Sequence, residues 1–201
     1  MILKIRTTEY DLRFLRGALP QLEAYLLSTD VYWPIGVHPP AGEPPYPQLT
    51  IGNILLSQLI LQVSAKSNQQ LAEYTTFSRG IEDLRSRWTV AWMKKNHLEF
   101  RARLNLWRDY LDEYRDSPQT NYDRYSYEVG RRVLLTLLST YRDQIPTQEF
   151  DLLSSLDRIL NKYLQTGKFI WQPEWTPVFP EAEFWFLYGI LPANPEIRIE
   201  K

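Results

Sequence analysis

The sequence predicts an all-α fold, a single-domain helical bundle of five or six helices with a long central helix. Leucines recur at three- to four-residue spacing near the N-terminus, which is the period of one apolar helical face. Residues 69–115 contain no proline and keep a helical apolar pattern. Hydrophobic residues make up 44% and charged residues 23% of the 201 residues, as is typical of one globular domain.

The first helix is predicted over residues 8–28. Thr8 is followed three residues later by Asp11, a pairing typical of a helix N-terminus. Pro20 lies in the middle of the pattern, so we expect a weakened or kinked helix there. The apolar face consists of Leu12, Leu15, Leu19, Leu22 and Leu26.

Residues 30–48 are predicted to form a long proline-rich loop. Six prolines in this stretch are too many for a helix or a central strand. The next helix is expected to begin at Thr50 and run to about Val63, apolar on more than one face and therefore well buried.

The proline-free stretch 69–115 carries two apolar stripes that do not share one helical face. The first stripe contains Phe77, Ile81, Leu84, Trp88 and Trp92, and the second contains Phe100, Leu104, Trp107 and Leu111. The change of face falls in residues 93–97. The pattern favours one long helix with a local kink at these residues, and two separate helices remain the alternative.

Two further helices are predicted, over residues 122–144 and 147–164, with Gly167 as a stop signal. Residues 168–201 are expected to form an extended C-terminal cover rich in proline and aromatic side chains. Within it, residues 168–180 are predicted to be extended, and residues 181–191 to form a short apolar helix or strand.

The residue inventory argues against most catalytic chemistry. The chain has no cysteine and two histidines, so thiol chemistry is excluded and histidine-rich metal sites are disfavoured. Nucleotide-binding, zinc-protease and serine-hydrolase motifs are missing. We therefore expect no metal and no cofactor, and lean towards a protein that is not an enzyme. We also expect a cytoplasmic protein that does not interact with membranes, because no apolar stretch is long enough for a signal peptide or a membrane span.

A ridge of basic residues at heptad spacing is one candidate interaction surface. It consists of Arg87, Lys94, Arg101, Arg108 and Arg115. On one helix these residues would form a nearly straight line about 42 Å long. The favoured interpretation is a solvated face with local salt bridges to residues such as Asp112. The alternative is a surface for nucleic acid or an acidic partner, although the net charge of −1 shows no overall basic character.

The proline–aromatic segments are the second candidate. Their aromatic anchors are Trp33, Tyr46, Trp171 and Trp175. The favoured interpretation is that they cover the apolar core, and the alternative is that they line a ligand or partner pocket.

These observations favour a non-catalytic interaction or scaffold domain that binds a protein partner or forms a homo-oligomer. The alternatives are a small-molecule-binding or enzymatic helical domain with a pocket under the aromatic segments, and nucleic-acid association through the basic ridge.

Overall fold

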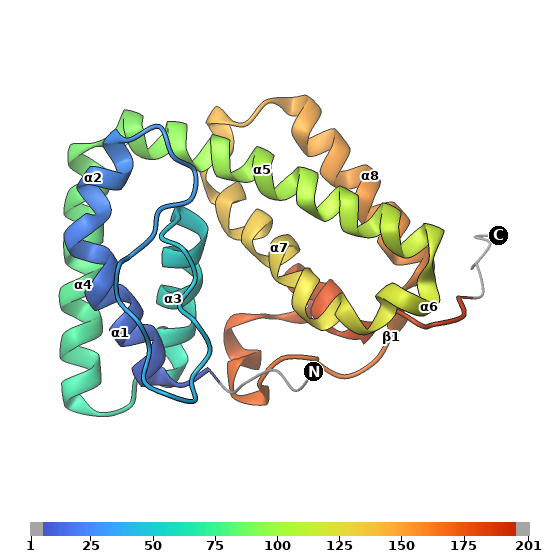
Figure 1. The fold of residues 1–201 in the computed structure, drawn as a ribbon, viewed down its shortest axis with the longest axis horizontal. Coiled ribbons are helices and arrows are strands. Elements are labelled where there is room, and N and C mark those ends of the chain that lie inside the picture. The colour runs from blue at the N-terminus through green and yellow to red at the C-terminus, as the bar shows by residue number, and fades with distance from the viewer. Residues whose placement is uncertain (1–5, 196–201) are drawn as a thin grey trace. The chain divides into compact units, whose positions relative to one another are not determined.

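The computed structural model describes residues 6–195, without the side chains of residues 142–144. Helices account for 73% of the chain, and the sheet in the described part has two short strands, which confirms the all-α prediction. The backbone contacts cluster in two compact units, Met1–Glu99 and Phe100–Lys201, which are described separately below (Figure 1). The single-domain organisation stays a prediction.

The first predicted helix is present in the first unit and is interrupted where Pro20 lies. It consists of α1 (Thr8–Ala18), the 3₁₀ turn η1 (Leu19–Gln21) and α2 (Leu22–Leu27). The cap is one residue earlier than expected, because the hydroxyl of Thr7 accepts a hydrogen bond from the amide of Tyr10 at 3.1 Å.

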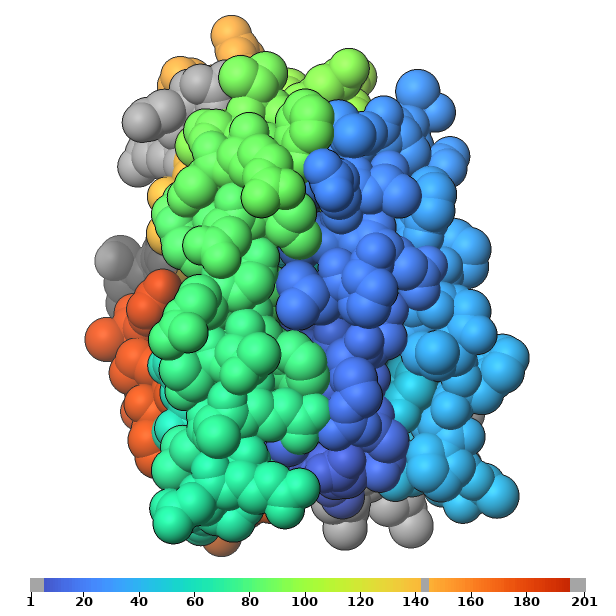
Figure 2. Space-filling model, turned by 90° about the vertical axis from the view of Figure 1, so that its left-hand side faces the viewer, coloured from blue at the N-terminus to red at the C-terminus, as the bar shows by residue number. Residues whose placement is uncertain are grey.

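Two more helices complete this bundle. The hydroxyl of Thr50 caps α3 (Ile51–Ser64), as predicted, by accepting from the amide of Asn53 at 3.1 Å. Ser67 and Gln70 form a reciprocal capping box at the start of α4 (Asn68–Arg87). Figure 2 shows α4 alongside α1 and α2, with the proline-rich loop on their other side. The core of the unit includes Leu12, Phe14, Leu15, Leu22, Tyr25, Leu49, Ile51, Ile54, Ile60 and Leu61.

The expected proline-rich loop follows α2 and returns to the bundle through specific contacts. Trp33 and Leu49 form an antiparallel bridge, with N–O distances of 3.2 and 2.8 Å. The hydroxyl of Tyr10 donates to the carbonyl of Pro45 at 2.8 Å. The loop is therefore held against α1 rather than projecting from it.

The expectation of a single helix over residues 69–115 is wrong. The chain leaves helical geometry at Trp88, where φ is −115° and ψ is 39°. A new helix, α5 (Thr89–Asp116), starts directly afterwards. Residues 93–97, where we expected a kink, lie inside α5.

Polar residues in the buried stripe of α5 explain the apparent change of face. Lys95, Asn96 and Glu99 are buried, and they continue the stripe between Trp92 and Phe100 at helical spacing. A pattern based on apolar residues alone misses this part of the stripe and shows a false rotation.

The buried polar groups of α5 that lie in the first unit have distant partners. The ammonium of Lys95 donates to the hydroxyl of Ser28 at 3.0 Å and lies 4.5 Å from the ring centre of Tyr25. The carboxylate of Glu99 accepts from the amide of Gly52 at 2.8 Å, in the first turn of α3. Burial lowers the pKa of Lys95.

The second unit contains the remaining helices. After α5 come α6 (Pro118–Asn121), the 3₁₀ turn η2 (Tyr122–Arg124), α7 (Tyr125–Leu138), the 3₁₀ segment η3 (Ser139–Gln144) and α8 (Thr147–Tyr163). The two helices predicted over residues 122–144 and 147–164 are therefore present, with 3₁₀ geometry at both ends of the first. The core combines Trp107, Tyr110, Tyr114, Tyr125, Val129, Val133, Leu156, Leu160, Phe184 and Phe186.

The C-terminal segment is more structured than predicted. Its elements are β1 (Gln165–Thr166), η4 (Pro173–Val178), α9 (Glu181–Phe184), η5 (Trp185–Leu187) and β2 (Gly189–Ile190). The expectation of an extended backbone over residues 168–180 is wrong at η4, because proline suits the first turn of a helix, where its missing amide has no partner to lose. Residues 181–191 contain both a helix and a strand. The part of the predicted cover at 196–201 lies outside the described residues.

Strands β1 and β2 pair antiparallel, with Gln165 opposite Ile190 and Thr166 opposite Gly189. A Cβ atom at Gly189 would lie 2.5 Å from the carbonyl oxygen of Gln165, so this close approach requires glycine. Across residues 6–195, no helix is both long and apolar enough to cross a membrane.

Candidate functional site

The predicted aromatic anchors of the first unit fasten the proline-rich loop. The indole N–H of Trp33 donates to the side-chain oxygen of Gln21 at 3.0 Å. The Tyr46 hydroxyl accepts from Nε of Arg13 at 3.1 Å, and its ring lies 4.9 Å from that of Tyr10. The polar atoms of both anchors are thus engaged by neighbouring side chains.

The predicted anchors of the second unit lie together in an aromatic cluster. Trp171 and Trp175 meet edge to face at 6.2 Å, and Trp171 packs against Phe179 at 5.4 Å. The indole N–H of Trp171 donates to the carbonyl of Ser126 at 3.1 Å. The four predicted pocket residues therefore fall into two pairs, one in each unit.

The predicted basic ridge is divided by the break at Trp88. Arg87 is the last residue of α4, whereas Lys94, Arg101, Arg108 and Arg115 follow on α5. Arg115 pairs with Asp112 at 3.2 Å, as expected, and Arg108 pairs with Asp109 at 3.2 Å. Local pairing of this kind is typical of a solvated helical face.

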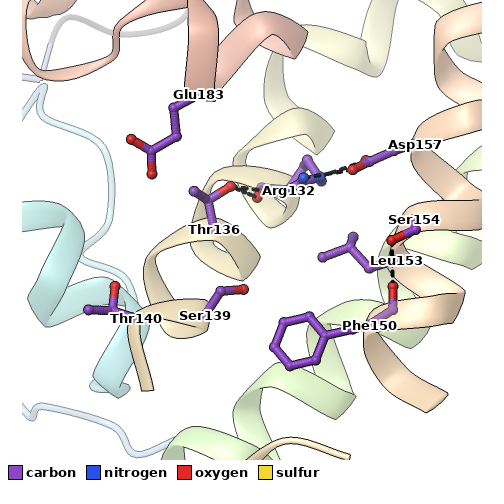
Figure 3. A pocket seen from close by; sticks show the side chains of 9 residues that line it. All are labelled: Arg132, Thr136, Ser139, Thr140, Phe150, Leu153, Ser154, Asp157 and Glu183. Atoms are coloured by element: carbon purple, nitrogen blue, oxygen red, sulfur yellow. Dashed lines mark hydrogen bonds and ion pairs between the residues drawn. The ribbon is translucent and has the colours of Figure 1, made fainter. Parts of the chain in front are cut away.

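A different region has the geometry of a ligand site. An open hollow of about 420 Å³ lies in the second unit beside α7 and α8. We call it the α7–α8 hollow. Figure 3 shows the nine side chains that line it: Arg132, Thr136, Ser139, Thr140, Phe150, Leu153, Ser154, Asp157 and Glu183.

Helical periodicity brings these side chains to the hollow. Arg132, Thr136 and Ser139 are separated by four and three residues, so they share one face of α7 and its 3₁₀ extension. On α8, Phe150, Leu153, Ser154 and Asp157 have the same kind of spacing. Glu183 comes from α9, which contributes a third wall (Figure 3).

A paired arginine and aspartate form the most buried polar part of the hollow. Nε and Nη2 of Arg132 donate to the two carboxylate oxygens of Asp157 at 2.7 and 2.8 Å. Nη1 donates to the hydroxyl of Thr136 at 2.6 Å, and the guanidinium lies 4.6 Å from the ring centre of Phe186. Arg132 is 8% exposed. This fork geometry fixes both side chains, since bidentate pairs are directional as well as strong.

The hydroxyl groups of the lining all donate hydrogen bonds to main-chain carbonyl oxygens. Thr136, Ser139, Thr140 and Ser154 donate to carbonyl oxygens three or four residues earlier in the chain, at 3.2, 2.7, 2.8 and 2.8 Å respectively. A hydroxyl has one hydrogen to donate and two lone pairs, so these groups can still act as acceptors.

The remaining lining is a carboxylate and an apolar wall. Glu183 is exposed, and in the part of the chain that the structure describes its carboxylate makes no ion pair. Phe150 and Leu153 supply the apolar surface, and the ring of Phe150 packs on Phe100 at 5.4 Å. The hollow therefore combines fixed polar groups with an apolar wall, as small-molecule sites do.

One titratable group that contacts Phe186, the ring beside Arg132, is held neutral. The hydroxyl of Tyr125 donates to the carbonyl of Phe186 at 2.5 Å in the protein interior. Burial raises the pKa of Tyr125 well above its ordinary value of 10.0. Phe186 thus receives a fixed hydrogen bond and supports the guanidinium of Arg132.

The described side chains of the lining include no set suited to metal binding or nucleophilic catalysis. Of the described lining side chains, none is a histidine, and within residues 6–195 no group of three or more acidic or histidine side chains could hold a metal ion. The serine and threonine hydroxyls donate to carbonyl oxygens instead of to a general base.

Comparisons of the chain with protein-family models, with curated proteins and with solved structures find no match in any of the three.

Sequence reasoning did not identify the α7–α8 hollow. Its signal was present as polar residues at helical spacing, with Arg132 and Thr136 on one helix and Ser154 and Asp157 on the next. Such a pattern is typical of a solvated face, and it indicates a shared site only once the two helices are known to be neighbours.

Proposed function

We propose that this chain is a non-catalytic binding domain and that the α7–α8 hollow is its site for a small ligand. The observation that carries the proposal is the bidentate pair of the buried Arg132 with the half-buried Asp157 within an open, polar-lined hollow. Removing two charges from water is costly, so an apolar pair at these positions would be about as stable. A fixed ion pair that lines a hollow is more simply explained by recognition.

The size and composition of the hollow support the same proposal. Its volume of about 420 Å³ falls within the range of roughly 300–1,000 Å³ that small-molecule pockets occupy. The polar groups come from α7, η3, α8 and α9, so their positions depend on the packing of several elements and not on a single loop.

Association with a protein partner or a second copy of the chain is a second candidate. It is supported by large side chains left in solvent, above all Val90 at 83% and Tyr127 at 72% exposure. Light scattering over a range of protein concentrations tests the second copy. A rise in mass that Tyr127→Lys or Val90→Lys abolishes supports it, and a constant monomer mass contradicts it.

The binding proposal is tested by screening the full-length, ¹⁵N-labelled chain with a library of small fragments. We expect amide shifts from several fragments to cluster at Thr136, Ser139 and Ser154. The variant Ser154→Trp fills the hollow and should abolish these shifts. The control Asn161→Trp adds the same side chain to an exposed position of α8 outside the lining and should preserve them.

Two results would overturn the proposal. Fragments could shift amides elsewhere and leave the lining of the hollow unchanged. Alternatively, shifts at the lining could persist in Ser154→Trp, which would show that they do not arise from occupancy of the hollow.

A further inference from the structure

We infer that the ligand of the α7–α8 hollow carries an ammonium group on a short apolar chain. This inference rests on the proposed function, and it concerns the chemistry that the described lining selects.

The charges of the lining favour a cation. Its positive group, Arg132, is committed to Asp157 through both Nε and Nη2. Glu183 adds a second carboxylate that has no ion-pair partner in the described chain. The described lining thus has one positive and two negative charges, and an ammonium ion would balance them.

The neutral groups favour a hydrogen-bond donor as well. The hydroxyls of Ser139, Thr140 and Ser154 already donate to main-chain carbonyls, so each can offer a ligand only its lone pairs as acceptors. An ammonium group has three N–H donors and no acceptor, which matches this set. A carboxylate ligand would face acceptors and a like charge, both of which oppose binding.

The apolar wall indicates what the rest of the ligand is, beyond its ammonium group. Phe150 and Leu153 lie on α8, on the same helical face as Ser154 and Asp157. A short alkyl chain can pack on this wall while its ammonium end reaches the acceptors. An ammonium with no apolar part would lose that contact.

Three probes of equal chain length test this inference: n-butylammonium, butyrate and 1-butanol, each titrated into the ¹⁵N-labelled full-length chain. We expect n-butylammonium to shift the amides of Thr136, Ser139 and Ser154, with a dissociation constant on the order of millimolar for so small a ligand. Butyrate and 1-butanol should shift these amides at least several-fold less at equal concentration.

A charge-neutral substitution isolates the contribution of Glu183. Glu183→Gln should weaken n-butylammonium about two- to fivefold, as expected for a partly solvated ion pair. The matched control is Glu181→Gln, at an exposed position of the same helix outside the lining, and it should leave affinity unchanged.

A fourth probe distinguishes two sources of the ammonium group, a lysine side chain of a partner and a free amine. Nα-acetyl-lysine methylamide presents the same butylammonium chain on a peptide backbone. Binding at least as tight as that of n-butylammonium assigns the group to a lysine side chain of a partner, and markedly weaker binding assigns it to a free amine.

The outcomes distinguish this inference from the proposed function. If 1-butanol or butyrate shifts the lining amides as strongly as n-butylammonium, the hollow binds ligands and the cation inference is wrong. If no probe and no library fragment shifts these amides, both are wrong. Equal affinity of wild type and Glu183→Gln for n-butylammonium would also contradict the role assigned to this carboxylate.

Discussion

Replacing Asp157 by asparagine tests the energetics of the ion pair on which the site depends. The substitution keeps the size of the side chain and removes its charge, so the guanidinium of Arg132 is left without its counter-charge. The pair is intermediate in exposure, with 10% of the arginine and 22% of the aspartate side chain in solvent.

The expected loss in the free energy of unfolding follows from that exposure. Removing one partner of a fully buried pair costs roughly 3–5 kcal/mol, and exposed pairs contribute about 0.2–1 kcal/mol. We therefore expect Asp157→Asn to lower the free energy of unfolding by about 2 kcal/mol. At about 2–4 °C per kcal/mol for a chain of this size, Tm should fall by roughly 4–8 °C.

The measurement is urea unfolding at neutral pH, followed by tryptophan fluorescence, together with a thermal scan. The matched control is Glu82→Gln, which breaks the surface pair of Glu82 with Arg85, whose side chains are 54% and 36% exposed. The control should lower the free energy of unfolding by less than about 0.5 kcal/mol. A loss in Asp157→Asn no larger than in the control would refute our reasoning that this pair is desolvated and structurally committed.

The double variant Arg132→Met/Asp157→Leu separates stability from recognition. An apolar pair of similar volume should restore the free energy of unfolding to within about 1 kcal/mol of wild type or raise it. Binding of n-butylammonium should nevertheless weaken, because the double variant removes the carboxylate oxygens of Asp157 from the lining. Unchanged binding would show that the ion pair is irrelevant to the ligand.

Two further predictions concern the fold. Burial raises the pKa of both Tyr10 and Tyr114 to about 12 from 10.0, so the folded state holds these protons to higher pH than the unfolded state does. The resulting stability is fully present below pH 10 and is lost as the pH rises from about 10 to 12. Urea midpoints that stay constant from pH 9 to 11 would contradict this. Gly189→Ala should destabilise the chain by about 2 kcal/mol or more because its Cβ would overlap the Gln165 carbonyl, whereas Gly167→Ala, with 4.0 Å to the same oxygen, should cost less than 1 kcal/mol in urea unfolding.

The parts of the fold that depend on local pattern could be predicted from the sequence. The leucine period of the first helix and its interruption at Pro20 are local properties, and the structure confirms both. The proline-rich loop follows from composition in the same way, because proline lacks the amide that helices and central strands need.

The break at Trp88 could not be predicted, because no proline or glycine marks it. The indole N–H of Trp88 donates to Glu23 at 2.8 Å, a contact between residues 65 positions apart. The buried stripe of α5 was misread for a similar reason. Lys95 and Glu99 can be buried because Ser28 and Gly52, far away in sequence, satisfy them.

The candidate site depends even more strongly on tertiary structure. Arg132 and Asp157 are 25 residues apart, and each alone is an ordinary charged residue on an amphipathic helix. Nothing in the local pattern shows that these two faces meet. The aromatic segments were more conspicuous in sequence, and in the structure Trp33, Tyr46 and Trp171 each have neighbours for their polar atoms.

Soaking crystals of the full-length chain with a fragment library that contains small amines tests the central claim most directly. Our account predicts that fragment density concentrates in the α7–α8 hollow, with an amine nitrogen within hydrogen-bond distance of Glu183, Asp157 or Ser154. A hollow that is accessible in the crystal and stays empty while fragments bind elsewhere would contradict the account.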